Sequence, residues 1–241
     1  MKRFALLAGF ALLFATLPLA AQESLRGLSP FTAHYEVYSN GNKLGDATMR
    51  LERVDGGNWR IDLDMHGSGL ARLARLQLRQ TTVFASDGSH YRPLRQVNTR
   101  RTLFSERTRT GTYDWEAGVA TWTGDVKPSR RDPVPLREGD LDALLIDLAV
   151  VRDADPGKTL HYRYVDGGRS REHTYVAADD PVSVEIDGLG YSAIKVARVE
   201  GNDRTEVWVA NGVPTPVRIF QLEDGEDSTD LRLVGYTRTG Q

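Results

Sequence analysis

Paired carboxylates are the first residues in this chain whose type and spacing could do chemistry. Asp62 and Asp64 alternate with apolar residues in the segment NWRIDLDMHG, so both belong to one face of a predicted strand, about 7 Å apart. That separation falls within the range of acid pairs that cleave glycosidic bonds. Arg60 shares their face, and no apolar pocket is apparent that would raise the pKa of either carboxyl. A solvated strand face accounts for the pattern, with a glycan hydrolase as the alternative.

The histidines and serines form no recognisable catalytic or metal-binding set. None of the five histidines has the close spacing of metal ligands. If residues 167–168 form the loop of one hairpin, Tyr162 pairs with His173, and His161 faces the opposite side; a slip of one residue would change these partners. Ser68 lacks the surroundings of a nucleophile elbow. We expect no metal, no cofactor and no catalytic residue, so a non-enzymatic protein is favoured over an ester hydrolase.

Arginines between residues 92 and 109 form a local positive region, which only one acid, Glu106, offsets. A guanidinium group matches the geometry of phosphates and carboxylates. Aromatic residues are sparse there, so nucleic acid is not the expected partner. The alternative is a solvated hairpin face, as most charged runs are. The candidates for contact with an anionic ligand group are Arg100, Arg101, Arg107 and Arg109.

The N-terminus predicts export. Lys2 and Arg3 precede an apolar run that is too short to span a bilayer comfortably, and small residues follow at positions 20–21. We therefore expect residues 1–21 to be a cleaved secretory signal peptide and residues 22–241 to be one periplasmic domain. No cysteine follows the apolar run, so lipidation is not expected, and no second apolar run suggests a transmembrane span in the mature protein.

Charge and cysteine usage narrow the function further. Cleavage would remove Lys2 and Arg3 from the 31 basic residues and none of the 33 acidic ones, which moves the formal net charge from −2 to −4. A mildly acidic chain is a poor candidate for nucleic-acid binding. The absence of cysteine excludes thiol chemistry and disulfides, so an exported chain of this composition must be stabilised by its core.

Most of the mature chain reads as short antiparallel strands separated by glycine turns. Strands are expected within the segments 31–54, 58–67, 76–100, 105–125, 159–165, 171–178, 181–186, 190–200, 204–210, 216–222 and 229–238. Residues 67–75 could form a short helix or a loop. In the last hairpin, Glu206, Trp208 and Ala210 share one strand face, and the prolines at 214 and 216 delay pairing until about Val217 or mark a sheet edge.

One segment, GDLDALLIDLAVVRD, predicts a helix near residues 140–152. Asp140 is the expected N-cap, and Asp142 suits the positive end of the helix dipole. The helix is apolar on nearly all sides, so it must be covered on most of them. A curved sheet does this better than a flat one. We therefore expect a mostly β fold: a single large, strongly curved antiparallel sheet, a half-barrel or β-roll, wrapped around one central apolar helix.

Four segments in order resemble a family of proteobacterial envelope proteins known only as domain of unknown function 3108. They are YEVYSNGNKLGDATMRL, the helical segment above, PGKTLHYRYVDGGRSREHTYVA with DGLGYSAIKVARVE, and EVWVANGVPTPVRIFQL. The Asp-Pro usual at the helix entry is displaced upstream to residues 132–133. The resemblance implies no catalytic residues. The tryptophan-strand ending is also similar to that of LolA-like lipoprotein carriers, which implies an apolar hollow closed by helices.

Export, the missing catalytic sets and a sheet around an apolar helix favour a periplasmic binding or chaperone-like protein for an apolar or lipid-like cell-envelope ligand. The candidate apolar wall consists of Trp208, Leu144 and Leu148. The alternatives are an envelope scaffold that binds another envelope protein through a sheet edge and the hydrolase considered above.

Overall fold

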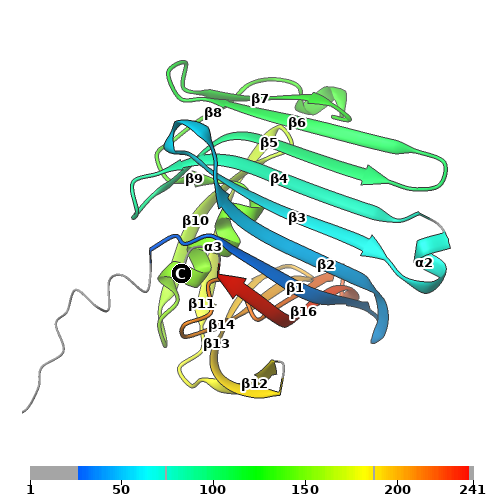
Figure 1. The fold of residues 1–241 in the computed structure, drawn as a ribbon. Coiled ribbons are helices and arrows are strands. Elements are labelled where there is room, and N and C mark those ends of the chain that lie inside the picture. The colour runs from blue at the N-terminus through cyan, green and yellow to red at the C-terminus, as the bar shows by residue number, and fades with distance from the viewer. Residues whose placement is uncertain (1–26, 74, 187, 239–241) are drawn as a thin grey trace, which may run out of the picture.

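The computed structural model describes residues 27–73, 75–186 and 188–238, and strands make up most of them (Figure 1). The expected signal peptide, residues 1–21, lies outside the described residues. In the described part of the chain, no helix is both long and apolar enough to cross a membrane.

The first half of the chain is an antiparallel meander in which each strand pairs with the next. Its alternation is the predicted one: Trp59 and Ile61 are buried while Arg60 and Asp62 lie on the opposite face. The short η1 (Asp55–Gly57) and α2 (Gly69–Leu73) connect strands, so the segment after residue 67 is helical for five residues. The strands are β1 (Phe31–Ser39), β2 (Asn42–Arg53), β3 (Trp59–Gly67), β4 (Gln77–Ser86), β5 (Tyr91–Arg101), β6 (Glu106–Asp114), β7 (Val119–Gly124) and β8 (Val134–Pro135).

The second half returns to the first and completes one 16-stranded sheet, because the last strand pairs with β1. The order runs β8-β7-β6-β5-β4-β3-β2-β1-β16-β15-β14-β13-β11-β10-β9, and β12 pairs with β13. Pairing is antiparallel except between β9 and β10. These strands are β9 (Asp140–Leu141), β10 (Thr159–Asp166), β11 (Arg169–Ala177), β12 (Val182–Ile186), β13 (Leu189–Glu200), β14 (Asp203–Ala210), β15 (Arg218–Glu223) and β16 (Glu226–Arg238).

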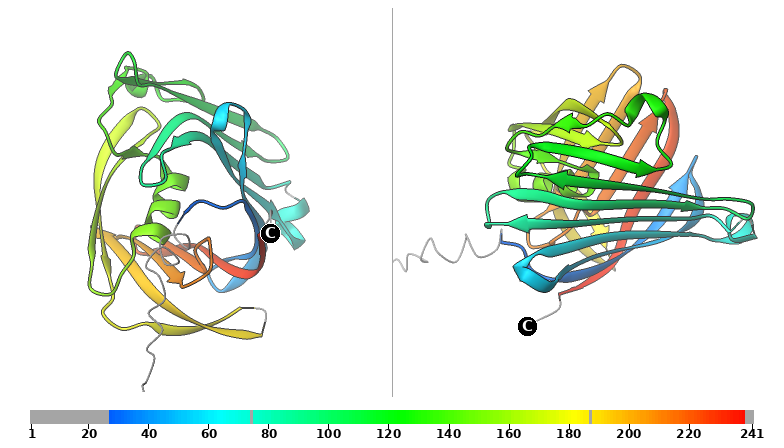
Figure 2. Two further views of the ribbon diagram at one scale, coloured as in Figure 1. Left: turned by 60° about the vertical axis from the view of Figure 1, so that its left-hand side comes forward. Right: turned by 90° about the horizontal axis from the view of Figure 1, so that it is seen from above.

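The sheet curls until its two ends approach each other (Figure 2). Side chains join these ends, because no strand pairing links them among the described residues. Arg109 on β6 donates to Asp166 at the end of β10 at 3.1 Å, and the Tyr113 hydroxyl donates to the Val165 carbonyl at 2.8 Å. A second apolar cluster fills this junction: Tyr113, Ala120, Trp122, Val126, Val134 and Val165. The expected strongly curved sheet is therefore confirmed.

The helix α3 (Ala143–Asp153) lies inside this curve (Figure 2, left). It is apolar on most sides as predicted, and its buried residues are Leu144, Leu145, Ile146, Leu148, Ala149 and Val150. Each buried leucine, isoleucine or valine side chain of this helix stabilises the fold by about 1.5–3 kcal/mol. The central helix expected near 140–152 is present, displaced by about a turn at its start.

The predicted N-cap, Asp140, is wrong. Asp140 lies in β9, where its carboxylate accepts from the Arg137 backbone and from Arg163. Asp142 is the N-cap: it accepts from the Leu145 N–H at 3.0 Å and from the Thr82 hydroxyl at 2.5 Å. The second bond ties the start of α3 to β4, so the cap also positions the helix within the sheet.

Candidate ligand-binding site

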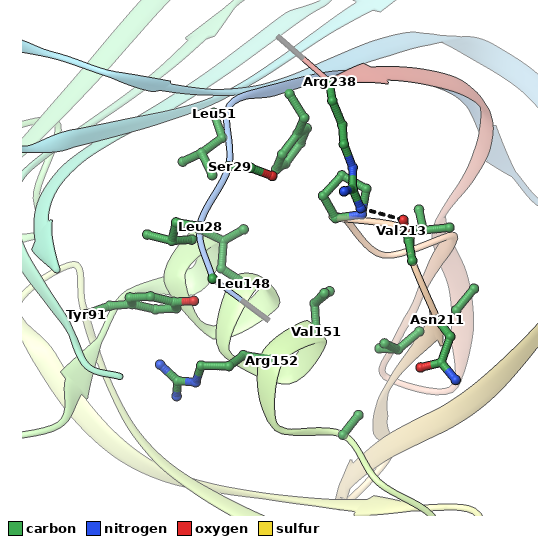
Figure 3. Close-up of a pocket in the computed structure, with 17 residues that line it drawn as sticks. Leu28, Ser29, Leu51, Tyr91, Leu148, Val151, Arg152, Asn211, Val213 and Arg238 are labelled. Atoms are coloured by element: carbon green, nitrogen blue, oxygen red, sulfur yellow. Dashed lines mark hydrogen bonds between the residues drawn. The ribbon is translucent and has the colours of Figure 1, made fainter. Parts of the chain in front are cut away.

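A cavity of about 340 Å³ lies at the C-terminal end of α3 (Figure 3). It is partly open and is bordered mainly by α3, by the chain entering β1 and by the loop between β14 and β15. Its volume is at the lower end of the roughly 300–1,000 Å³ of small-molecule sites. Polar and apolar atoms contribute about equally to its exposed wall, although most of the lining residues are apolar: Leu28, Phe31, Leu51, Tyr91, Leu148, Val151, Ala154, Val209, Ala210, Val213 and Pro214.

Helical spacing and a turn bring these side chains together. Leu148, Val151 and Arg152 lie three and four residues apart, so they share one face of α3. Opposite them, β14 ends at Ala210 and the predicted Asn-Gly turn follows, with Gly212 at φ +79°. Strand pairing resumes where predicted, when the Val217 N–H donates to the Trp208 carbonyl at 2.8 Å. The intervening residues 211–214 are therefore free to form one wall.

Two arginines supply the charge at the cavity. The guanidinium of Arg152 lies 4.6 Å from the centre of the Tyr91 ring and donates to the Ser89 carbonyl at 2.6 Å. The carboxylate of Asp153 forms an ion pair with this guanidinium at 2.7 Å. Arg238 donates to the Gly212 carbonyl at 2.6 Å, and no carboxylate among the described residues pairs with it. Arg238 is therefore the cation of this cavity that remains available to an anionic group.

Of the three residues predicted to form an apolar wall, only Leu148 lines this cavity. Leu144 lies one turn earlier on the same face of α3 as Leu148, and it is buried in the core instead. Trp208 is buried too, but its ring is covered by the guanidinium of Arg218 at 4.7 Å. The next residue, Val209, lines the cavity instead. Ala210, which alternation groups with Trp208, also lines the cavity, so the position along β14 and not the strand face alone decides which residues reach it.

The predicted anionic contacts lie elsewhere. Arg100, Arg107 and Arg109 line a separate cavity of about 280 Å³ near the other end of β5 and β6. Arg109 is already paired with Asp166. Arg101 lies on the opposite face of β5, 3.6 Å from Glu106. Nine residues along β5 separate Tyr91 from Arg100, or about 30 Å, so the two cavities are at opposite ends of the sheet.

The candidate hydrolytic carboxylates lie on the face opposite the core. Asp62 accepts from Arg60 at 2.8 Å and from Thr81 at 2.6 Å. Asp64 accepts from Arg79 at 2.6 Å. Both carboxylates are ion-paired on a polar strand face, whereas a general acid needs an apolar environment that favours its protonated form. The pair therefore reads as part of a salt-bridged strand face.

The histidine hairpin has the predicted register. Tyr162 pairs with His173, and Asp166 pairs with Arg169 around residues 167–168. His161 and His173 consequently face opposite sides of the sheet. Within residues 27–73, 75–186 and 188–238, no group of three or more potential ligand side chains could hold a metal ion.

An unpredicted feature is a pair of acidic side chains on the interior helix. Burial raises the pKa of Asp142 to about 7, although its two hydrogen bonds oppose the shift. Burial also raises the pKa of Asp147 to about 7, with a further contribution from the Asp142 charge. Asp147 lies among core residues, but part of the residue remains accessible to solvent. None of the described residues forms a hydrogen bond with its carboxyl group. Its only sequence signal is an acid interrupting an apolar helix.

Comparison with known proteins decides the family. Residues 34–232 match the family described as "Protein of unknown function (DUF3108)". The chain belongs to this DUF3108 family, as its four segments predicted. No protein with a curated description matches it.

Among solved structures, a beta-barrel-like DUF1849 protein from Brucella abortus shares 14% identity with this DUF3108 chain at a TM-score of 0.58, covering 89% of this chain and 99% of the other. That likeness supports the fold alone. A DUF1089 protein from Pseudomonas aeruginosa shares 10% identity over 88% and 95% of the chains, at a TM-score of 0.36. The likeness to LolA-like carriers stays a prediction.

Proposed function

We propose that this DUF3108 protein is an exported, non-enzymatic binding protein that holds an apolar or lipid-like ligand of the cell envelope beside α3. The observation that carries the proposal is the cavity next to Leu148, lined mainly by apolar residues, with Arg238 at its wall and no carboxylate of the described residues paired with it. Small-molecule pockets commonly combine apolar side chains with a few placed polar groups, as this cavity does. Arg238 favours a ligand that ends in a carboxylate or a phosphate.

Export is supported by the sequence of the first 21 residues. Cell fractionation and N-terminal sequencing of the native protein test it. The expected result is a periplasmic protein that begins at Gln22. A cytoplasmic protein, or one that retains the apolar segment, would contradict the proposed location.

The scaffold alternative has one observation in its favour. The five-residue strand β12 pairs on one side only, with β13, among the described strands. An unpaired strand edge can accept a strand from another protein. Cross-linking in cells followed by mass spectrometry would map a partner to residues 182–186 if this alternative holds.

Native mass spectrometry tests the binding function. Protein purified from the periplasm without detergent is expected to carry an added mass, and extraction is expected to release an amphiphile. Purified protein stripped of that molecule should then take up cis-parinaric acid, a fluorescent fatty acid. A native protein without added mass that also fails to bind cis-parinaric acid would overturn the proposal.

A further inference from the structure

One end of the sheet carries exposed apolar side chains flanked by arginines. The turn after β1, the helix α2 and the turn between β5 and β6 all lie at this end, beyond paired strand ends (Figure 1, right-hand side). We call residues 69–73, 75 and 100–107 the basic tip. The tip is about 30 Å along β5 from the cavity beside α3, so its role is separate from ligand binding there.

The apex of the basic tip is apolar and fully presented to solvent. Phe104 is 92% exposed, the highest value among the exposed large apolar residues of the described chain, and Leu103 beside it is 46% exposed. Single exposed apolar residues are common on soluble proteins. Two adjacent ones at the apex of a long hairpin, however, form an apolar protrusion. Such a protrusion can insert into an apolar surface while the rest of the sheet stays in water.

Arginines surround this apex on both faces of the hairpin. Arg100 and Arg107 are direct cross-strand partners, an arrangement of like charges that destabilises a hairpin. Arg100 pairs with no carboxylate in the described part of the chain, and Arg107 reaches only Asp125, at 4.0 Å. Arg101 faces the other side. The repulsion between Arg100 and Arg107 would be relieved by an anion between them.

The neighbouring helix extends the positive charge. Arg72 and Arg75 are exposed at α2 and just after it. Arg75 adopts φ +50°, a conformation that costs a non-glycine residue energy. A cavity of about 420 Å³ lies between them and Arg101. The basic tip therefore presents arginines from two connections around one apolar apex, on a chain whose overall charge is negative.

We propose that the basic tip docks on the surface of an anionic lipid bilayer. Phe104 and Leu103 enter the boundary between headgroups and acyl chains, while the flanking arginines bind lipid phosphates. Apolar residues bordered by basic ones are the pattern of proteins that lie on membranes. Each basic residue near an anionic surface adds to the attraction, and guanidinium groups suit phosphate oxygens. The inference is independent of the proposed ligand function, because it uses none of the residues that line the cavity beside α3.

Vesicle co-sedimentation of the full mature protein tests the docking. Wild-type protein is expected to sediment with vesicles of phosphatidylcholine and phosphatidylglycerol, to bind pure phosphatidylcholine far less, and to be released as salt rises. Phe104→Ser is expected to weaken binding to the anionic vesicles roughly tenfold. Arg100→Gln with Arg107→Gln should do the same and should also flatten the salt dependence.

Two matched controls address exposure and charge away from the tip. Val176→Ser removes a 52% exposed apolar side chain from β11, and Lys158→Gln removes a charge near the end of α3. Both variants should bind the vesicles as wild type does. The proposal is overturned if wild-type protein ignores anionic vesicles, or if the tip variants bind as well as the controls. A hairpin that captures a protein partner but no vesicles would also overturn it.

Discussion

The hydroxyl oxygens of Tyr35 and Thr215 lie 2.5 Å apart in the buried core, although 180 residues separate them in the chain. Tyr35 also donates to the Pro216 carbonyl at 2.9 Å. Thr215 stands between the two prolines of the loop after β14 and is fully buried. The prolines therefore do more than delay strand pairing, because they present a threonine and a carbonyl to the first strand.

This contact predicts a non-additive effect on stability. Tyr35→Phe should lower the free energy of unfolding by about 1–2 kcal/mol, because a buried hydrogen bond is lost and its partners remain. Thr215→Val should have a similar cost. The double variant should lose clearly less than the sum of the two, as measured by urea unfolding. Strictly additive losses would show that the two hydroxyls do not support each other.

The interior acids predict a pH-dependent stability. Asp147 titrates near 3.8 when unfolded and near 7 when folded, so the folded state holds the proton more tightly. Stability from this group is therefore present at low pH and is lost as pH rises from about 4 to about 7. Between pH 5 and pH 8 the loss should be on the order of 1–3 kcal/mol. Asp142 acts in the same direction.

Thermal unfolding at pH 5 and pH 8 checks this, with Asp147→Asn as the matched variant. Burial lowers the pKa of His173 to about 4, so that group favours the folded state as pH rises and opposes the trend below about 6.5. Because both proteins contain His173, the difference between them isolates Asp147. Asp147→Asn should be relatively more stable at pH 8 than at pH 5. Equal differences at the two pH values would contradict a carboxyl that is protonated in the fold.

The closure of the curved sheet predicts contrasting effects at two adjacent glycines. Gly167 and Gly168 both have positive φ, so alanine costs about 1–2 kcal/mol at either position. A Cβ on Gly168 would lie 1.9 Å from the Arg130 carbonyl oxygen, whereas a Cβ on Gly167 meets only the flexible end of Arg109 at 3.1 Å. Gly168→Ala should therefore be less stable than Gly167→Ala by a further 1–3 kcal/mol or so in urea unfolding. Equal losses would mean that residues 128–130 do not pack on this hairpin.

Alternation and periodicity predicted most of the fold. The apolar series from Trp59 to Met65, the helix after residue 140 and the Gly-Gly hairpin register all appear as expected. These features depend on local patterns. The N-cap was misplaced because Asp140 and Asp142 are equally good caps in sequence, and only the pairing of β9 with β10 assigns Asp140 to a strand.

The site was harder to predict because it depends on long-range placement. Leu28, Tyr91, Leu148, Val209 and Arg238 come from five distant segments, and no local pattern relates them. Val209 and Ala210 line the cavity and Trp208 does not, which alternation alone does not predict because Ala210 shares the strand face of Trp208. The arginines near residue 100 were correctly seen as a basic group, but the sequence does not say that they lie at the opposite end of the sheet from Leu148.

Fluorescence titration with cis-parinaric acid, comparing wild type with Val151→Trp, tests the proposed binding function most directly. Val151 lines the cavity, so tryptophan there should fill it. The wild-type protein should bind the fatty acid saturably, and Val151→Trp should bind it at least about tenfold more weakly, a loss of about 1.4 kcal/mol or more. Val176→Trp, at an exposed position of β11, serves as the control and should bind the fatty acid as the wild type does. Absence of saturable binding by wild-type protein, or equal affinity in a folded Val151→Trp variant, would contradict a ligand site beside α3.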